Sequence, residues 1–131
     1  VYVDGAHNVE AVRAYVETVR TLHSDDDKIL VFAAVKDKEY DAMIQLLADG
    51  IEWREIIVTS VDSDRRADSH KLADLFRKWV DVPVHVSDVI DDAMDMAVEH
   101  RSQRDDTDIY CVGSLYLVGG VKRWRNEHDQ F

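Results

Sequence analysis

Two hydrophobic periods alternate along this chain. Apolar runs of strand length occupy 1–3, 29–35, 53–59, 84–86 and 109–112. Each run is followed by a stretch in which apolar residues recur every three or four positions, the period of an amphipathic helix. The run 29–35 is almost continuously apolar, which is expected of a strand that is covered on both faces in a parallel sheet.

The helical stretches place apolar stripes at 9–19, 40–47, 72–79, 90–98 and 115–124. Polar residues at their borders predict the helix ends. Asp68 or Ser69 is expected to cap the third helix, and Ser87 or Asp88 the fourth. Gly50 is expected to end the second helix in the left-handed conformation. Five strand–helix units predict an α/β fold, a Rossmann-like three-layer α/β/α sandwich with a mostly parallel sheet and right-handed crossovers.

Composition narrows the class of protein. With 131 residues and 46% hydrophobic content, the chain fits one domain over 1–131. A net charge of −11 argues against a nucleic-acid partner. The sequence also predicts no membrane association, because no apolar stretch approaches the roughly 20 residues of a span and nothing resembles a signal peptide. Cys111 is alone in an apolar run, as expected of a reduced, buried residue in a cytoplasmic protein.

The loop after the first strand is the first candidate site, because open α/β sheets bind ligands beyond the carboxyl ends of their strands. Asp4, His7 and Asn8 bring a carboxylate, an imidazole and a carboxamide into five residues. The helix that starts at about Asn8 offers unpaired N–H donors to an anion or a ribose. The alternative is that Asp4 and Asn8 only make turn and cap hydrogen bonds.

Two further loops follow strands. Gly113-Ser114 precedes a predicted helix, so its N–H groups and hydroxyl suit a carboxylate or phosphate; the alternative is an ordinary serine N-cap. The segment 36–38 either serves a phosphate or is a solvated turn in which Asp37 caps the next helix, and the turn is favoured.

No metal site is predicted. The acidic segments 25–27, 62–64 and 105–106 lack the full spacing of a calcium loop. The histidines outside the first loop lack paired ligand spacing. These are His23, His70, His85, His100 and His128.

Three motifs in order resemble the folylpolyglutamate synthase/dihydrofolate synthase family of the Mur ligase superfamily, specifically its C-terminal domain. They are DGAHN at 4–8, VFAAVKDKEYDAM at 31–43 and GSLYLVGGVKR at 113–123. A weaker fourth match is Arg66-Ala67. The chain departs from the family pattern at Val9, where Pro is usual, and at Gly120, where Glu is common.

The resemblance implies an ATP-dependent ligase that forms an amide. ATP phosphorylates a carboxylate of folate or dihydropteroate, and the amino group of L-glutamate attacks the acyl phosphate. It also implies ATP and Mg²⁺ as cofactors and a monomeric parent enzyme. The Mg²⁺ would be held mainly by an N-terminal ATPase domain, whose GxxxxGK[ST] loop this chain lacks. The start at Val1 agrees with a fragment, which is expected to be inactive alone.

Carried over residue by residue, the resemblance assigns Asp4 to the nucleotide, at its ribose, and Asn8 to the orientation of nearby groups in the cofactor site. His7 and Ser114 would line the glutamate pocket as catalytic and substrate-binding residues, and Arg66 is a further candidate contact. Two alternatives remain. One is a peptidoglycan-building Mur ligase, which usually has a DYAHNP-like loop, and the other is a non-catalytic α/β binding module.

Overall fold

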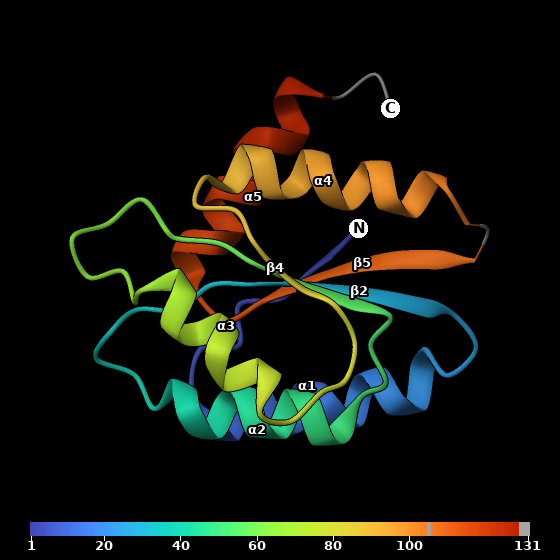
Figure 1. Cartoon of the computed structure of the whole chain (residues 1–131), viewed down its shortest axis with the longest axis horizontal. Coiled ribbons are helices and arrows are strands. Elements are labelled where there is room, and N and C mark those ends of the chain that lie inside the picture. Colours follow the sequence, from blue (N-terminus) through green and yellow to red (C-terminus); the bar gives the residue numbers. More distant parts are fainter. Residues whose placement is uncertain (105, 129–131) are drawn as a thin grey trace.

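The computed structural model describes residues 1–104 and 106–128, and Figure 1 shows a central sheet between two layers of helices. The strands are β1 (Tyr2–Val3), β2 (Asp27–Phe32), β3 (Glu55–Val58), β4 (Val84–Val86) and β5 (Thr107–Val112). All the pairings are parallel, in the order β1-β5-β2-β3-β4. The helices are α1 (Val9–Leu22), α2 (Tyr40–Gly50), α3 (Ser69–Arg77), α4 (Ile90–Ser102) and α5 (Leu115–Glu127). The predicted fold class is confirmed.

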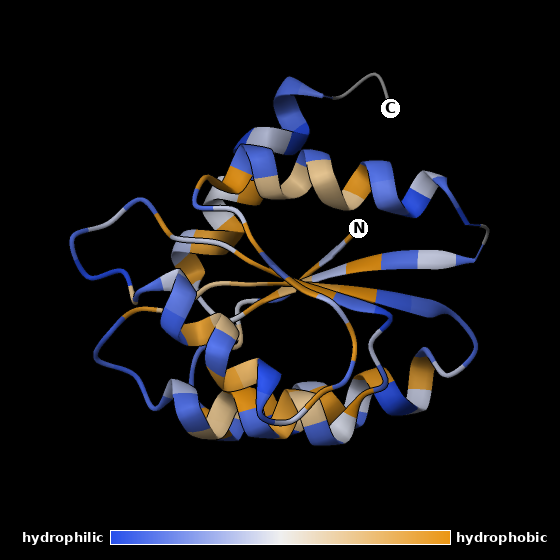
Figure 2. Ribbon diagram, in the orientation of Figure 1, coloured by the Kyte–Doolittle hydropathy of each residue, from blue (hydrophilic) through white to orange (hydrophobic). Residues whose placement is uncertain are grey.

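Each face of the sheet has its own apolar core. Helices α1, α2 and α3 cover one face, where Phe32 and Tyr110 are buried, and α4 and α5 cover the other, where Ile29 and Cys111 are buried. Figure 2 shows the apolar residues on the strands and on the inner sides of the helices, with polar residues outside. Adjacent residues of one strand point to opposite faces, so a strand between two helical layers is apolar throughout. None of the helices in the described part of the chain combines the length and apolar composition of a membrane span.

Strand register aligns the loops that carry the candidate chemistry. Val3 pairs with Cys111, and Phe32 pairs with both Val112 and Val58. The carboxyl ends of β1, β5, β2 and β3 therefore lie side by side along one edge, which we call the carboxyl edge. The loops that begin at Asp4, Ala33, Thr59 and Gly113 all leave the sheet there.

Helix ends were predicted with mixed success. Asp68 caps α3 as predicted, accepting a hydrogen bond from the N–H of His70 at 2.9 Å. The N-cap of α4 is Val89, so the prediction of Ser87 or Asp88 is wrong. The Asp88 carboxylate instead accepts a hydrogen bond from the Ser69 hydroxyl. Ser69 is the first residue of α3, so the partner of Asp88 comes from another helix and the local sequence around Asp88 did not indicate it.

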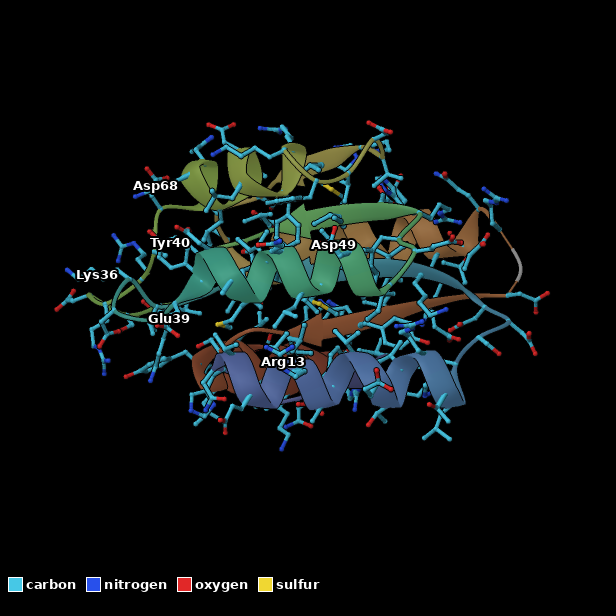
Figure 3. The ribbon with its side chains drawn as sticks, turned by 90° about the horizontal axis from the view of Figure 1, so that it is seen from below. Arg13, Lys36, Glu39, Tyr40, Asp49 and Asp68 are labelled. Carbon is cyan, nitrogen blue, oxygen red and sulfur yellow. The ribbon has the colours of Figure 1, made fainter. Side chains whose placement is uncertain are left out.

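The second helix also begins and ends differently from the prediction. Its N-cap is Glu39 rather than Asp37, and Figure 3 shows Glu39 near Lys36 at one end of the molecule. Gly50 is the last residue of α2 and does not end it in the left-handed conformation. A Cβ on Gly50 would lie 2.3 Å from Cγ1 of Val16, so this glycine allows α2 to pack closely on α1.

Candidate active site at the carboxyl edge of the sheet

The loop after β1 is held by its own polar groups and by β5. The N–H of Asp4 donates to the carbonyl oxygen of Cys111 at 2.9 Å. The Asp4 carboxylate accepts a hydrogen bond from the N–H of Ala6 at 2.8 Å, forming a compact turn. His7 Nδ1 lies 2.8 Å from the carbonyl oxygen of Gly5, which orients the ring. The other ring nitrogen, Nε2, takes no part in this hydrogen bond and is available to a ligand.

Both predicted cap residues do cap helices. Asn8 Oδ1 accepts a hydrogen bond from the N–H of Ala11 at 2.8 Å at the start of α1. The Oγ atom of buried Ser114 accepts one from the N–H of Tyr116 at 3.1 Å at the start of α5. An accepting hydroxyl still has its own proton to donate. The cap interpretation of Ser114 therefore leaves its hydroxyl able to bind a ligand anion.

Gly113 sets the position of Ser114. Its φ of 128° is in a region that L side chains rarely adopt. A Cβ here would lie 2.3 Å from the carbonyl oxygen of Ala33 and 2.8 Å from the ring of Phe32. The chain thus leaves β5 in close contact with the end of β2, and only a glycine fits.

One pocket of about 460 Å³ brings four strand-end loops together. Its lining residues are His7, Val35, Lys38, Arg65, Ser114, Leu115 and Tyr116. His7 and Ser114, which were predicted to share a site, meet here from the loops after β1 and β5. Asp4 and Asn8 are outside this lining and flank His7 in the chain.

Lys38 and Arg65 supply two cationic groups that the sequence did not assign to this pocket. Arg65 forms an exposed ion pair with Asp37, and the hydrogen bond from Arg65 lowers the pKa of the Asp37 carboxyl. Lys38 lies in the segment 36–38, for which a turn was favoured over a phosphate site. The resemblance singled out Arg66 rather than its neighbour Arg65, and only the folded chain brings Arg65 into this pocket.

Arg66 lies elsewhere. Its Nη1 donates to the carbonyl oxygen of Ser63 at 3.0 Å, and its side chain lines a larger cavity of about 770 Å³ toward α5. Asp62, Asp68 and Asp88 share this lining. Arg66 therefore does not join His7 and Ser114.

These features define a Rossmann-like domain whose pocket, at the carboxyl edge of a parallel sheet, has both polar and apolar side chains in its lining. Residues 1–115 match the model of the family of Mur ligase, glutamate ligase domain. The chain therefore belongs to the Mur ligase glutamate ligase domain family.

Individual relatives support this family assignment. The chain is 33% identical over 122 residues to the probable bifunctional folylpolyglutamate synthase/dihydropteroate synthase of Haloferax volcanii, covering 93% of this chain and 14% of that protein. Among solved structures, it resembles Mycobacterium tuberculosis folylpolyglutamate synthase complexed with ADP, with 25% identity, a TM-score of 0.75 and coverage of 92% and 29%. The fold also matches E. coli FolC in complex with DHPP and ADP, with a TM-score of 0.83, 17% identity and coverage of 97% and 29%.

The predicted resemblance to the folylpolyglutamate synthase family is confirmed by these relatives. The chain spans 14% of the length of the Haloferax relative and 29% of each of the two solved chains. It is thus comparable to one part of these proteins.

Proposed function

We propose that this chain is the C-terminal domain of an ATP-dependent ligase that joins L-glutamate to a carboxylate of folate or dihydropteroate. The observation that carries the proposal is the convergence of His7, Ser114, Lys38 and Arg65 on one pocket. Glutamate has two carboxylates and an amino group that must lose a proton before it attacks, so cations, a hydroxyl donor and a proton acceptor suit its recognition. The pocket contains each of these.

Lys38 and Arg65 suit the two carboxylates of glutamate, and Arg65 would exchange its exposed ion pair with Asp37 for the ligand. Lys38 approaches from the loop after β2 and Arg65 from the loop after β3, so they can bind different parts of one small molecule. An arginine binds a carboxylate through paired N–H groups, whereas a lysine acts as a point charge. Ser114 would donate its remaining proton to the same ligand.

In the proposed reaction, a substrate carboxylate oxygen attacks the γ-phosphorus of ATP, and ADP leaves. The glutamate nitrogen then attacks the acyl carbon, the C–O bond to phosphate breaks, and an amide forms. The nitrogen must lose a proton during this step. We assign its removal to His7, whose ring is oriented by the Gly5 carbonyl oxygen.

Asp4 and Asn8 are proposed to serve the nucleotide, with Asp4 at the ribose and Asn8 holding the start of α1. The Mycobacterium relative is complexed with ADP, which supports a nucleotide as a ligand of the parent enzyme. Mg²⁺ would offset phosphate charge, bound mainly by the N-terminal ATPase domain. Leu115 and Tyr116, 61% and 47% exposed beside the pocket, are suited to contact that domain. The parent enzyme is proposed to be monomeric and cytoplasmic.

Gly5 favours the folate branch over a peptidoglycan-building ligase. A Cβ on Gly5 would lie 2.9 Å from Cδ2 of Leu115. A tyrosine at this position, as in a DYAHNP-like loop, would therefore require Leu115 to move. The absence of a side chain at Gly5 therefore goes with the close approach of Leu115.

The test uses the full-length protein. Glutamate-dependent ADP release is measured with dihydropteroate or tetrahydrofolate for the parent and for His7→Ala, Ser114→Ala and Lys38→Ala. We expect His7→Ala to lower kcat by about 100-fold or more. Lys38→Ala should chiefly raise the KM for glutamate. Lys122→Ala, which removes an exposed lysine of α5, is the matched control and should leave both constants unchanged.

Each alternative predicts a different result. Turnover with a peptidoglycan precursor and none with folates would assign the chain to the peptidoglycan-building ligases. An absence of turnover with both substrate classes would favour a binding module. A folate-dependent rate that is unchanged in His7→Ala would retain the activity and remove His7 from the mechanism.

A further inference from the structure

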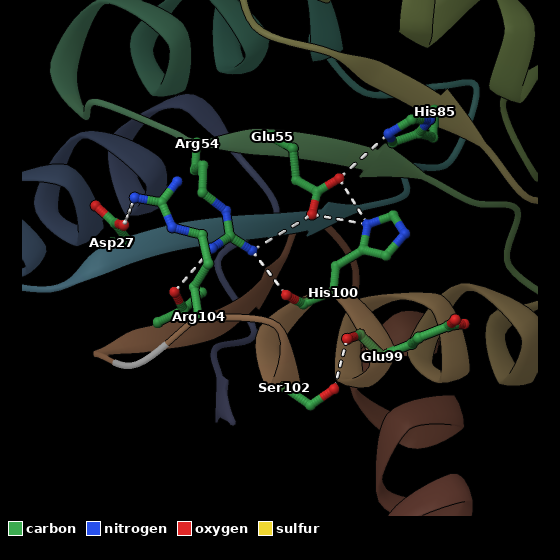
Figure 4. Close-up of polar contacts among 9 residues, drawn as sticks. Asp27, Arg54, Glu55, His85, Glu99, His100, Ser102 and Arg104 are labelled. Atoms are coloured by element: carbon green, nitrogen blue, oxygen red, sulfur yellow. Dashed lines mark hydrogen bonds and ion pairs between the residues drawn. The ribbon is translucent and has the colours of Figure 1, made fainter.

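We propose that Glu55, His85 and His100 form a binding site for a divalent transition-metal ion, with Zn²⁺ as the best fit. Their side chains meet on the α4 side of the sheet (Figure 4). His100 Nδ1 lies 2.8 Å from each Glu55 carboxylate oxygen, and His85 Nε2 lies 3.2 Å from Oε2. One ligand atom from each residue lies within 4.8 Å of the others.

The cluster is distinct from the glutamate pocket. Glu55 is the first residue of β3, so it lies at the amino edge of the sheet, whereas the pocket lies at the carboxyl edge. His85 is on β4 opposite Ile57, which shares a sheet face with Glu55. His100 is in the last turn of α4. Two ligands are thus placed by paired strands and the third by a packed helix, which gives a site its precision.

The donor set matches zinc chemistry. Two imidazoles and one carboxylate, with a remaining position for water, form a known zinc ligand set. With metal–ligand bonds of about 2.0 to 2.1 Å, tetrahedral ligand atoms are about 3.3 Å apart. The separations of 2.8 and 3.2 Å from Oε2 approach that spacing, so small side-chain movements would admit an ion.

The exposed fractions of the three side chains also fit a site that an ion enters from solvent. The Glu55 side chain is 9% exposed, whereas His100 is 28% and His85 40% exposed. The carboxylate is therefore buried at the base of the cluster, and the imidazoles border the solvent. An incoming ion could keep a water ligand on that side.

Arg54 also approaches the Glu55 carboxylate. Its Nη2 lies 3.7 Å from Oε1, whereas His85 approaches Oε2. The guanidinium is fixed by hydrogen bonds to Thr107 Oγ1 at 2.9 Å and to the His100 carbonyl oxygen at 3.1 Å. Arg54 is thus a positioning residue on the Oε1 side of Glu55, whereas His85 lies on the Oε2 side and His100 contacts both oxygens.

The other account of this cluster is a hydrogen-bonded network in which both imidazoles donate to Glu55. A bound ion would take up the imidazole lone pairs and the carboxylate in place of these hydrogen bonds, so only the metal-site account predicts saturable binding of one ion per chain. The two accounts therefore differ in a measurable way.

The experiment uses the purified 131-residue chain, stripped with a chelator and free of any histidine tag. Zn²⁺ binding is measured by calorimetry, and Co²⁺ binding by its visible absorption, which reports coordination geometry. We expect one Zn²⁺ per chain and the intense Co²⁺ bands of a low-coordinate site. His85→Gln should weaken binding by more than about tenfold, and Zn²⁺ should raise the Tm of the parent but not of this variant.

The matched control is His70→Gln, which changes an exposed histidine on α3, away from the cluster. It should bind Zn²⁺ like the parent. His100→Gln provides a second loss-of-ligand variant, and circular dichroism verifies that each variant is folded. Failure of the parent to saturate at one ion per chain would overturn the proposal. So would unchanged affinity in folded His85→Gln and His100→Gln, or an equal loss in His70→Gln. All of these readouts are independent of ligase activity.

Discussion

The N–H of Asp4 donates to the carbonyl oxygen of Cys111 at 2.9 Å, which extends the pairing of β1 with β5 into the first loop. His7 follows Asp4 by three residues, and Ser114 follows Cys111 by three residues. This hydrogen bond therefore helps to fix the position of His7 relative to Ser114. The pocket geometry thus depends on a strand of only two residues. Changes that disturb the end of β5 should affect the pocket and the stability together.

Gly113→Ala should destabilise the chain by about 2 to 4 kcal/mol, because it adds backbone strain and a steric clash. The new Cβ would meet the Ala33 carbonyl oxygen at 2.3 Å. Gly119→Ala is the matched control, since a Cβ there meets nothing within 4 Å. In a helix it should stabilise by about 0.5 to 1 kcal/mol. Urea unfolding measures both, and equal effects would contradict the assignment.

Gly120→Ala tests the departure from the family motif. Gly120 is buried where α5 packs on α4, and a Cβ would lie 2.5 Å from Cδ1 of Ile90. We expect a loss of about 1 to 3 kcal/mol from overpacking, in contrast to the gain at Gly119. The double variant with Ile90→Val should recover part of the loss. No recovery would show that another contact limits this position.

Cys111 should be inert in the folded chain. It is fully buried beside Met94, and burial raises the pKa of its thiol to about 12. The reactive thiolate is therefore scarce at physiological pH. Iodoacetamide should label Cys111 in urea and leave it unmodified without denaturant, as measured by mass spectrometry. Rapid native labelling with intact circular dichroism would contradict this prediction.

Asp26 should stabilise the fold at neutral pH. Burial acts to raise its pKa, but hydrogen bonds from Lys28 and Tyr110 outweigh that effect and lower it. Lys28 Nζ lies 2.7 Å from Oδ1 of this carboxylate. A lowered folded pKa contributes stability above the unfolded pKa, and this contribution is lost as the pH falls through the folded value.

Asp26→Asn should therefore cost about 2 kcal/mol at neutral pH, and the difference from the parent should shrink as the pH falls below about 4. Urea unfolding at several pH values measures the difference. Asp25→Asn, in the same loop but exposed, is the control and should have little effect. A penalty that is independent of pH would indicate that packing, rather than ionisation, is responsible.

Asp108 should behave in the opposite way. Burial, followed by the neighbouring Asp26, raises the pKa of its carboxyl. A raised folded pKa makes the ionised group a cost at neutral pH, and the cost disappears as the pH falls below the unfolded value. Asp108→Asn should stabilise at neutral pH by less than about 1 kcal/mol, with the gain disappearing in acid. Destabilisation at neutral pH would refute the assignment.

Much of the fold follows from local pattern. The alternating hydrophobic periods were sufficient to predict five strand–helix units. The cap at Asp68 could be predicted because its hydrogen bond joins residues within one helical turn. The loop holding Asp4 and His7 could be identified because both residues directly follow a strand. These features involve residues that are close in sequence, so the sequence alone contains the information needed to predict them.

Contacts between distant residues depended on the tertiary structure. Strand order brings the loop after β3 to His7, the conformation of that loop places Arg65 rather than Arg66 in the pocket, and the start of α3 gives Asp88 a partner in Ser69. It also joins His85 and His100 to Glu55, although their spacing indicated no metal site. The sequence by itself determined the layered α/β class and the strand-end loops, because hydrophobic periodicity and cap chemistry are local. Only the tertiary structure decided which side chains meet, because strand order and helix packing set distances that no local period contains.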